Sequence, residues 1–452
     1  MRLETRIRSF GMAVMASKGF LQFKRNSARL RRILSGQRSE LHYFHQVDDP
    51  YSFLVVQHLQ TLEADFSVPL RTHLVSCDDQ AYQGDAQRFA LWAYNDAKSI
   101  APFYGEALPT PPNSESSEVP DTEPNDEVKL PNREQTEIAN MLLAPFVDSP
   151  DFAEQALKIG RSLWQDEKLN PPNSGTGNFS TVLKQNNELL KKLGHYRGGA
   201  FYFEGEWFWG VDRISLLRAR LSEEGFAKRQ TKDGQQDHLA LKALKVTANS
   251  ASNVTLEYFP SLRSPYTAIG HQQVADLIQR SGVQLTLRPV MPMLMRGIPA
   301  PRSKQLYIIM DCAREARAKK IAFGNFVDPF GEPVKRAFAL YPGALSLGRG
   351  LEFIGEYLAA CFAQGIDIDS EDGLKTVVKK AGLDWHILHE EAAKYNWQNV
   401  LEENLQTMLG AGLWGVPSFR VSGGSKEGSF SCWGQDRIWR VEHEIALRSA
   451  KI

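Results

Sequence analysis

Residues 263–270 read RSPYTAIG, and residues 48–55 read DDPYSFLV. Each stretch follows a short apolar run, VTLEYF at 254–259 or LHYF at 41–44, and each opens a segment with a helical pattern. The residue before the proline is Ser264 in one copy and Asp49 in the other. Serine and aspartate are both preferred N-cap residues, and proline is preferred in the first helical turn. The sequence therefore predicts the same strand–turn–helix unit twice.

A second signature also occurs twice. Residues 198–213, GGAFYFEGEWFWGVDR, parallel residues 415–437, GVPSFRVSGGSKEGSFSCWGQDR. Each has an apolar strand, a Gly-containing turn, a second strand and then WGxDR at the start of a helix. Because the two signatures recur in the same order, the sequence predicts an internal duplication.

The second copy gives the clearest order of elements. A strand at 254–259, a helix and a strand at 283–290 form a βαβ unit, for which a right-handed crossover is expected. A long helical stretch at about 303–410 then precedes a closing hairpin and helix. We expect an α/β fold with a sheet of mixed direction and helices on both faces.

Composition suggests where the copies begin and end. Residues 1–38 form a basic helical arm, and the first copy spans residues 39–222. Within it, residues 108–134 are rich in Pro, Ser and acidic groups, which is typical of a disordered excursion. Residues 223–252 are polar and suit a linker, although 239–246 has a helical pattern, and residues 253–452 form the second copy.

The overall charge is balanced, with 53 Lys and Arg against 53 Asp and Glu, so no nucleic-acid partner is expected. The arm is the exception, because its ten basic residues are opposed by Glu4 alone. We interpret it as packed on the body or solvated, with nucleic-acid or membrane contact as the alternative. No membrane span or secretory segment is recognisable, so a cytoplasmic location is expected.

The four cysteines are widely spaced and form no CxxC motif; they are Cys77, Cys312, Cys361 and Cys432. This spacing disfavours a disulfide scaffold, a zinc knuckle and an internal dithiol redox centre. The sequence also has no P-loop, dinucleotide fingerprint or HExxH motif, so neither nucleotide nor metal chemistry is supported.

Four motifs in order carry a resemblance to a known family: SPY, a strand ending in RP, KxxYxxxDxxR from Lys304 to Arg314, and GVPSF followed by WGQDR. The chain resembles the DsbA-like branch of the thioredoxin superfamily. Within that branch it is most similar to 2-hydroxychromene-2-carboxylate isomerases and kappa-class glutathione transferases. The resemblance implies two tandem thioredoxin-like domains, each with a helical insertion, arranged as a pseudo-dimer.

The resemblance also implies a glutathione site in the second copy. Ser264 would hold the glutathione thiolate, and Val416, before a cis Pro417, would pair with the peptide backbone. Asp436, assisted by Gln435, would bind the γ-glutamyl end. Lys304 would contact the glycine carboxylate, although the loop before it is shorter than in the kappa-class pattern and lacks the expected asparagine.

The first copy departs from this pattern at three positions. It has Asp49 in place of the serine, Gly199 in place of the cis-proline and Phe89 near the lysine position, while Asp212 persists. A carboxylate would repel a thiolate. We therefore expect the first copy to be structural, with Asp49 as a general acid or base as the alternative.

Three functions remain open from the sequence. The first is a glutathione-dependent isomerase or transferase acting on an electrophilic or unsaturated aromatic substrate. The second is a non-catalytic thioredoxin-like protein that binds an extended peptide beside Pro417. The third is a DsbA-type thiol-disulfide oxidoreductase, which the missing CxxC motif disfavours.

Overall fold

The computed structural model describes residues 2–76, 82, 85–105, 107–109, 129–172, 179–228 and 243–450. The chain divides into two compact units. The first unit is Gln22–Ala243, and the second unit joins Met1–Leu21 to Leu244–Ile452. The residues of the basic arm are thus divided between the two units.

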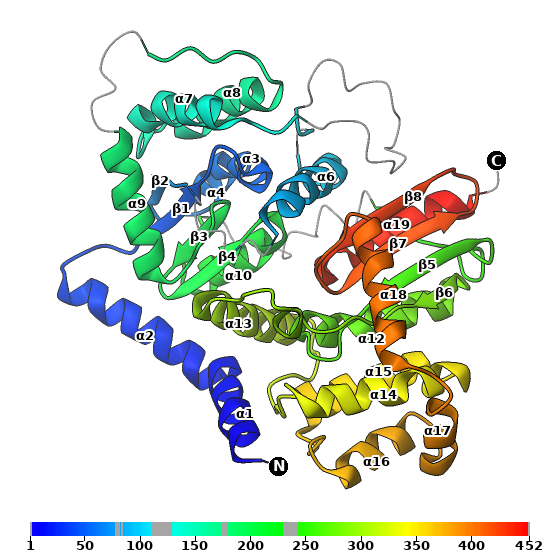
Figure 1. Ribbon diagram of the computed structural model, residues 1–452. Coiled ribbons are helices and arrows are strands. Elements are labelled where there is room, and N and C mark those ends of the chain that lie inside the picture. Colours follow the sequence, from blue (N-terminus) through cyan, green and yellow to red (C-terminus); the bar gives the residue numbers. More distant parts are fainter. Residues whose placement is uncertain are drawn as a thin grey trace. The chain divides into compact units, whose positions relative to one another are not determined.

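The second unit is built on a four-stranded sheet in the order β6-β5-β7-β8 (Figure 1). Its strands are β5 (Val254–Phe259), β6 (Gln284–Leu287), β7 (Ser418–Gly423) and β8 (Ser429–Trp433). β5 is parallel to β6 and antiparallel to β7, and β8 is antiparallel to β7. The sheet therefore has mixed direction, as the sequence predicts.

Helices connect these strands in the predicted order. The crossover helix is α12 (Pro265–Ser281), and α19 (Ile438–Ser449) closes the unit. The insertion between β6 and β7 consists of α13 (Arg302–Ala318), α14 (Glu332–Ser346), α15 (Gly350–Ala359), α16 (Glu371–Lys380), α17 (Trp385–Ala392) and α18 (Trp397–Gly410). The helix α1 (Leu3–Ala16) belongs to this unit and packs against α13.

The first unit has a sheet of the same order and directions, β2-β1-β3-β4. Its strands are β1 (Leu41–His45), β2 (Leu70–Leu74), β3 (Ala200–Phe203) and β4 (Glu206–Trp209). Its helices are α2 (Lys18–Leu34, shared with the second unit), α3 (Pro50–Val56), α4 (Leu59–Asp65), α6 (Ala86–Tyr104), α7 (Arg133–Leu143), α8 (Phe152–Trp164), α9 (Phe179–Leu193) and α10 (Ile214–Glu223). The expected pair of thioredoxin-like folds with helical insertions is confirmed, while the internal duplication remains a prediction.

Two local predictions need correction. The strand predicted at 283–290 ends at Leu287. Arg288 and Val290 still donate to the carbonyls of Tyr258 and Pro260, but Pro260 has no N–H with which to return the next bond of the parallel ladder. The predicted excursion at 108–134 ends early, since Asn132 caps α7. Residues 110–128 of that excursion lie outside the described residues, as do 239–242 of the helical pattern in the linker, and residues 243–246 are not helical.

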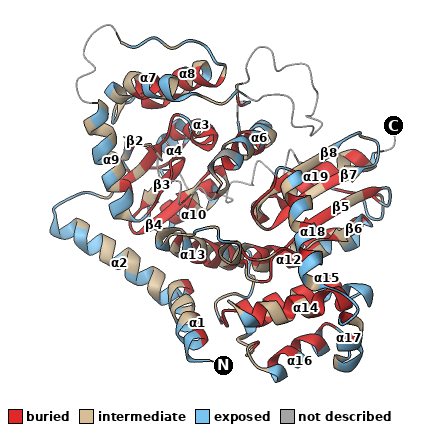
Figure 2. Ribbon diagram, viewed as in Figure 1, coloured by how far each residue is buried: buried red, intermediate tan, exposed pale blue. Residues whose placement is uncertain are grey.

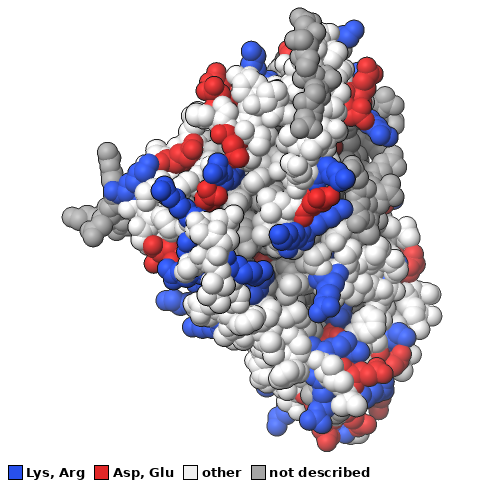
Figure 3. Space-filling model, turned by 90° about the vertical axis from the view of Figure 1, so that its left-hand side faces the viewer, with Lys and Arg blue, Asp and Glu red and all other residues white. Residues whose placement is uncertain are grey.

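Aromatic and aliphatic side chains fill the core of the second unit, where the rings of Tyr258 and Phe419 stack with centroids 5.3 Å apart. Cys312, Cys361 and Cys432 are buried and form no disulfide with the described residues, and Cys77 lies outside those residues. Among the described helices, none has the length and hydropathy to span a bilayer. On the face in Figure 3, basic side chains are scattered among acidic and uncharged ones.

Candidate functional site

Ser264 is the N-cap of α12. β5 ends at Phe259, and the chain turns through five residues before Pro265 begins the helix. The Thr267 N–H donates to Ser264 Oγ at 3.1 Å, and Ser264 is buried. The structure describes no acceptor for the hydrogen of this hydroxyl. The Ser264 Oγ therefore sits at the positive end of a 17-residue helix with its own donor unused.

Two further hydroxyls lie in the same turn of chain. The Oγ of Ser261 and the Oγ1 of Thr267 are fully buried and have no hydrogen-bond partner in the described part of the chain. Most buried polar groups are hydrogen-bonded, so two orphaned hydroxyls beside one N-cap are unusual. Sequence reasoning missed both, because serine and threonine near a helix start are common.

The loop before β7 carries two of the predicted residues. The Val416–Pro417 peptide bond is cis, as the resemblance implies. Ser418 pairs with Phe259, so Pro417 lies at the edge of the sheet from which the chain leaves β5 toward Ser264. Val416 is half-buried, and its backbone makes no hydrogen bond to the described residues. Its N–H and C=O are available to an extended ligand.

The WGQDR turn lies at the same edge, because the Gly434 N–H donates to the Pro417 carbonyl at 2.9 Å. Gln435 is buried, and its Oε1 accepts from Lys319 Nζ at 2.8 Å. Its Nε2 is buried with no acceptor among the described residues. Asp436 keeps 27% of its side chain exposed, which leaves the carboxylate within reach of a ligand.

Two cations lie near Trp414, three residues before Pro417. The Lys304 Nζ is 6.0 Å from the centroid of the Trp414 ring. Arg296 donates to the Trp414 carbonyl at 3.0 Å, burial lowers its pKa, and its Nε has no acceptor in the described residues. Sequence reasoning missed Arg296, although it lies in the loop that lacks the expected asparagine.

The structure thus brings Ser264, Val416, Pro417, Gln435 and Asp436 to one edge of the sheet. Lys304 lies farther away. The rise of an α-helix is about 1.5 Å per residue, so the Cα atoms of Lys304 and Lys319 lie about 22 Å apart along α13. Because Lys319 contacts Gln435, a tripeptide would have to be extended to meet Gln435 and Lys304 together.

The first unit has the corresponding arrangement with different chemistry. Asp49 caps α3, and its Oδ2 accepts from the N–H and the O–H of Ser52 at 2.9 and 2.8 Å. The Oδ1 is buried and has no described donor. Burial raises the pKa of Asp49, and the charge of Arg197 lowers it in part. A Cβ on Gly199 would lie 3.0 Å from Asp49 Oδ2, so the glycine position adjoins the cap.

A tyrosine–aspartate pair supports the equivalence of the two caps. Tyr51 donates to Asp96 at 2.6 Å in the first unit, and Tyr266 donates to Asp311 at 2.8 Å in the second. Both pairs span 45 residues. Matching Tyr51 with Tyr266 also matches Phe89 with Lys304. The Phe89 ring packs under Arg197, with 3.9 Å between the guanidinium carbon and the ring centroid. The first unit therefore has an aromatic ring at the lysine position.

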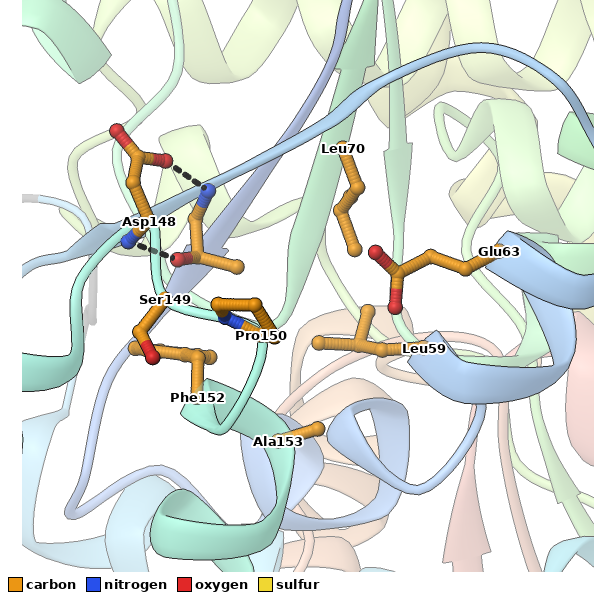
Figure 4. Close-up of a pocket in the computed structure, with 9 residues that line it drawn as sticks. Leu59, Glu63, Leu70, Asp148, Ser149, Pro150, Phe152 and Ala153 are labelled. Atoms are coloured by element: carbon orange, nitrogen blue, oxygen red, sulfur yellow. Dashed lines mark hydrogen bonds between the residues drawn. The ribbon is translucent and has the colours of Figure 1, made fainter.

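A hollow of about 240 Å³ lies elsewhere in the first unit (Figure 4). Leu59, Glu63, Leu70 and Phe152 line it, and Asp148 at its rim exchanges two hydrogen bonds with Thr72 at 2.8 and 2.9 Å. Neither Asp49 nor Gly199 contributes to it. It is separate from both helix caps.

The family comparison covers the unit that holds Ser264. Residues 255–446 match the DSBA-like thioredoxin domain. The second unit therefore contains a DSBA-like domain that includes Ser264, Lys304, Val416, Pro417 and the WGQDR turn. No curated protein matches the chain.

Solved structures resemble part of the chain at low identity. A 2-hydroxychromene-2-carboxylate isomerase is 20% identical, over 42% of this chain and 94% of that one, with a TM-score of 0.33. The cytosolic disulfide reductase DsbM from Pseudomonas aeruginosa is 18% identical, over 43% and 100%, with a TM-score of 0.33. The same reductase with GSH is 16% identical, over 43% and 99%, with a TM-score of 0.32.

Proposed function

We propose that the DSBA-like domain of the second unit is a glutathione-dependent isomerase or transferase. The observation that carries the proposal is the Ser264 hydroxyl. Its oxygen accepts from the Thr267 N–H, which leaves its hydrogen to donate to a sulfur anion at the amino end of α12. A dithiol oxidoreductase needs a cysteine at this place, and the chain has none there.

The Ser264 environment suits a thiolate more than a thiol. A free thiol has a pKa of about 8.5, so most of it is protonated near neutral pH. A hydrogen bond to a charged group contributes about 1.5 to 3 kcal/mol, equivalent to a pKa shift of about one to two units. The amino terminus of α12 adds partial positive charge that also favours the anion. The role of Ser264 is to hold the thiol in its reactive form.

The remaining residues fit the rest of a glutathione molecule. The backbone of Val416 would pair with the cysteinyl residue as an added strand does. Asp436 would bind the α-ammonium group, and the orphaned Nε2 of Gln435 would donate to the neighbouring carboxylate. At the other end, Arg296 and Lys304 would bind the glycine carboxylate, with Arg296 replacing the asparagine that the loop lacks.

Bound glutathione would supply a nucleophilic thiolate that adds to an electron-poor carbon of an unsaturated organic substrate. The protein's part is to keep the sulfur deprotonated, fix the tripeptide between its two ends and position the thiolate. The same residues serve isomerisation and conjugation, because both begin from the activated anion. The class of substrate is therefore an electrophilic or unsaturated aromatic compound.

A glutathione titration of the full chain tests the proposal. Saturable binding that Ser264→Ala and Asp436→Ala each weaken, together with thiol-dependent turnover of chlorodinitrobenzene-type electrophiles or isomerisation of cis enones, supports it. The matched controls are Asp49→Ala and Asp212→Ala in the first unit, which should leave binding unchanged. No stabilisation of the protein at millimolar glutathione would contradict the proposal and favour a non-catalytic peptide-binding protein.

A further inference from the structure

The helix α1 exposes its apolar face and turns its polar face toward the protein, whereas a surface helix usually does the opposite. Its residues toward the second unit are small or polar, with Thr5, Ser9 and Ala16 buried. Its large apolar residues point the other way. Leu3, Ile7, Phe10 and Val14, here called the α1 stripe, recur with helical spacing along one face and are 71, 63, 72 and 39% exposed.

Polar contacts fix which face of α1 meets the unit. Arg8 pairs with the buried Asp328 at 2.8 Å, and the Asp328 N–H donates to Ser9 Oγ at 2.9 Å. Asp328 also pairs with Arg263, at 2.7 Å. Because these partners lie on the side opposite the α1 stripe, the helix cannot rotate the stripe inward without losing them.

The helix α2 repeats this arrangement in the first unit. Arg25 and Arg32 pair with the buried Glu206 and Glu204 at 2.7 Å each. On the outer side, Phe23, Leu30, Ile33 and Leu34 are 57 to 78% exposed. No residue of α2 is buried, and Figure 2 shows the helix in tan and pale blue along its length. Arg25 and Arg32 thus point inward, while the large apolar groups face outward.

The concentration of these apolar groups is far above that of the rest of the surface. Of the fifteen large hydrophobic side chains that are exposed in the described residues, eight lie on α1 and α2. Single exposed apolar residues are ordinary, whereas a set aligned on helix faces marks a binding surface.

The charges that each helix carries indicate what covers its apolar face. Exposed cations accompany the apolar residues: Arg6, Lys18, Arg31 and Arg38, while Arg2 and Arg29 pair with Asp369 and Glu224 at 3.6 and 3.8 Å. Glu4 is the one acidic residue in 1–38. A second copy of the chain would bring the same excess of positive charge and repel the first. An anionic lipid surface complements both the apolar stripe and the cations.

We propose that α1 and α2 bind the surface of an anionic membrane, each lying in the headgroup region with its apolar face toward the acyl chains. The full-length protein should then sediment with vesicles of phosphatidylcholine and phosphatidylserine, and much less with phosphatidylcholine alone. Added salt should weaken the binding, because part of the attraction is electrostatic.

The double variant Ile7→Ser/Phe10→Ser should weaken binding to the mixed vesicles by at least about tenfold, since burial of each large apolar side chain contributes to affinity. Arg6→Gln should weaken it by about fivefold. The matched control Leu345→Ser/Ile387→Ser changes two side chains that are 44 and 55% exposed elsewhere, and should bind like the wild type.

Three results would overturn the proposal. They are no binding to mixed vesicles, equal binding by Ile7→Ser/Phe10→Ser and wild type, and a lipid-independent dimer that this double variant dissociates. Far-ultraviolet circular dichroism of each variant, expected to match the wild type, separates loss of membrane binding from loss of folding. Glutathione binding should be unchanged in every variant, which keeps this proposal separate from that of the second unit.

Discussion

The two helix caps solve the same structural problem with different charges. Asp49 and Ser264 each lie five residues after the equivalent phenylalanine of a central strand, and each accepts the N–H three residues ahead, at 2.9 and 3.1 Å. Either side chain therefore meets the need of a helix for an N-cap. Only the serine can donate a hydrogen bond to an anion while remaining neutral.

The residues next to the two caps also make the first cap more negative than the second. Asp48 precedes Asp49, whereas Arg263 precedes Ser264 and pairs with Asp328. In the first unit the Ser52 hydroxyl donates to Asp49. In the second unit the equivalent hydroxyl, that of Thr267, has no partner among the described residues. The comparison shows that a capping residue alone says little about function. The two caps differ in the hydrogen-bond donors that remain unused around them.

Exchanging the caps should give the largest effect. Ser264→Asp would keep α12 capped, as Asp49 does for α3, but its carboxylate would oppose a thiolate. We expect glutathione binding at neutral pH to fall by about 100-fold or more, since a favourable charge-assisted bond of up to about 3 kcal/mol becomes a repulsion. Isothermal titration with unchanged far-ultraviolet circular dichroism would measure it.

The reciprocal change serves as its control. Asp49→Ser in the first unit should leave the affinity for glutathione unaltered. If Ser264→Asp binds as tightly as the wild type, Ser264 does not contact the thiol and the comparison of the caps loses its functional meaning.

Neutralising the two WGxDR aspartates should give a smaller contrast. Asp436→Asn removes a charge-assisted bond to the α-ammonium group, so we expect glutathione affinity to fall about 10- to 100-fold. Asp212→Asn is its match in the first unit, where the carboxylate accepts from Tyr104 at 2.8 Å. That variant should bind normally; equal losses in both would mean that the aspartates act on folding.

The cations near Trp414 should rank below Asp436. Arg296→Gln should raise the dissociation constant about tenfold, because a half-buried guanidinium forms a strong charge-assisted hydrogen bond to a carboxylate. Lys304→Gln should raise it only a few-fold, since its ammonium group lies over the Trp414 ring and must reach the ligand. A glutathione analogue amidated at the glycine end should remove both differences. The reverse ranking would restore Lys304 as the main carboxylate contact.

Acid should destabilise the first unit more than the second. Burial lowers the pKa of His42 to about 4, that of His45 to about 3, and that of His73. The second unit has buried His271, with a pKa of about 4, and half-buried His443, which is also shifted down. A histidine with a lowered folded pKa binds its proton more readily when unfolded, so its stabilisation is complete above about pH 6.5 and declines toward about pH 4.

Hydrogen exchange on the full chain can separate the two units during this titration. Protection factors in β1–β4 should drop first as the pH falls from about 6.5, followed by those in β5–β8. Parallel losses in the two sheets would show that the three histidines of the first unit do not set its acid stability.

The sequence was informative about features that depend on local chemistry. N-cap residues, a proline in the first turn and apolar alternation predicted β5, α12 and the cap at Ser264, and the resemblance supplied the cis peptide at Pro417. Features that depend on distant contacts were missed. The Thr267 hydroxyl has no partner among the described residues because the tertiary structure brings no acceptor to it. Arg296 contacts the Trp414 carbonyl because the chain returns to it more than a hundred residues later.

The arm shows the same limit. Its excess of basic residues was visible in the sequence, but the sequence does not say which face of a helix meets the body. Thr5 and Ser9 are buried through contacts such as that with Asp328, more than three hundred residues away, and this leaves Ile7 and Phe10 outside. The outward apolar stripe is a consequence of tertiary structure.

The pKa of the thiol of bound glutathione tests the central claim most directly. It can be followed by the ultraviolet absorbance of the thiolate in complexes of the wild type and of Ser264→Ala, with Asp49→Ala as the matched control. We predict a pKa about one to two units below the ordinary value of about 8.5 in the wild type and in Asp49→Ala, and a return toward that value in Ser264→Ala. An equal thiol pKa in the wild type and in Ser264→Ala would contradict the account.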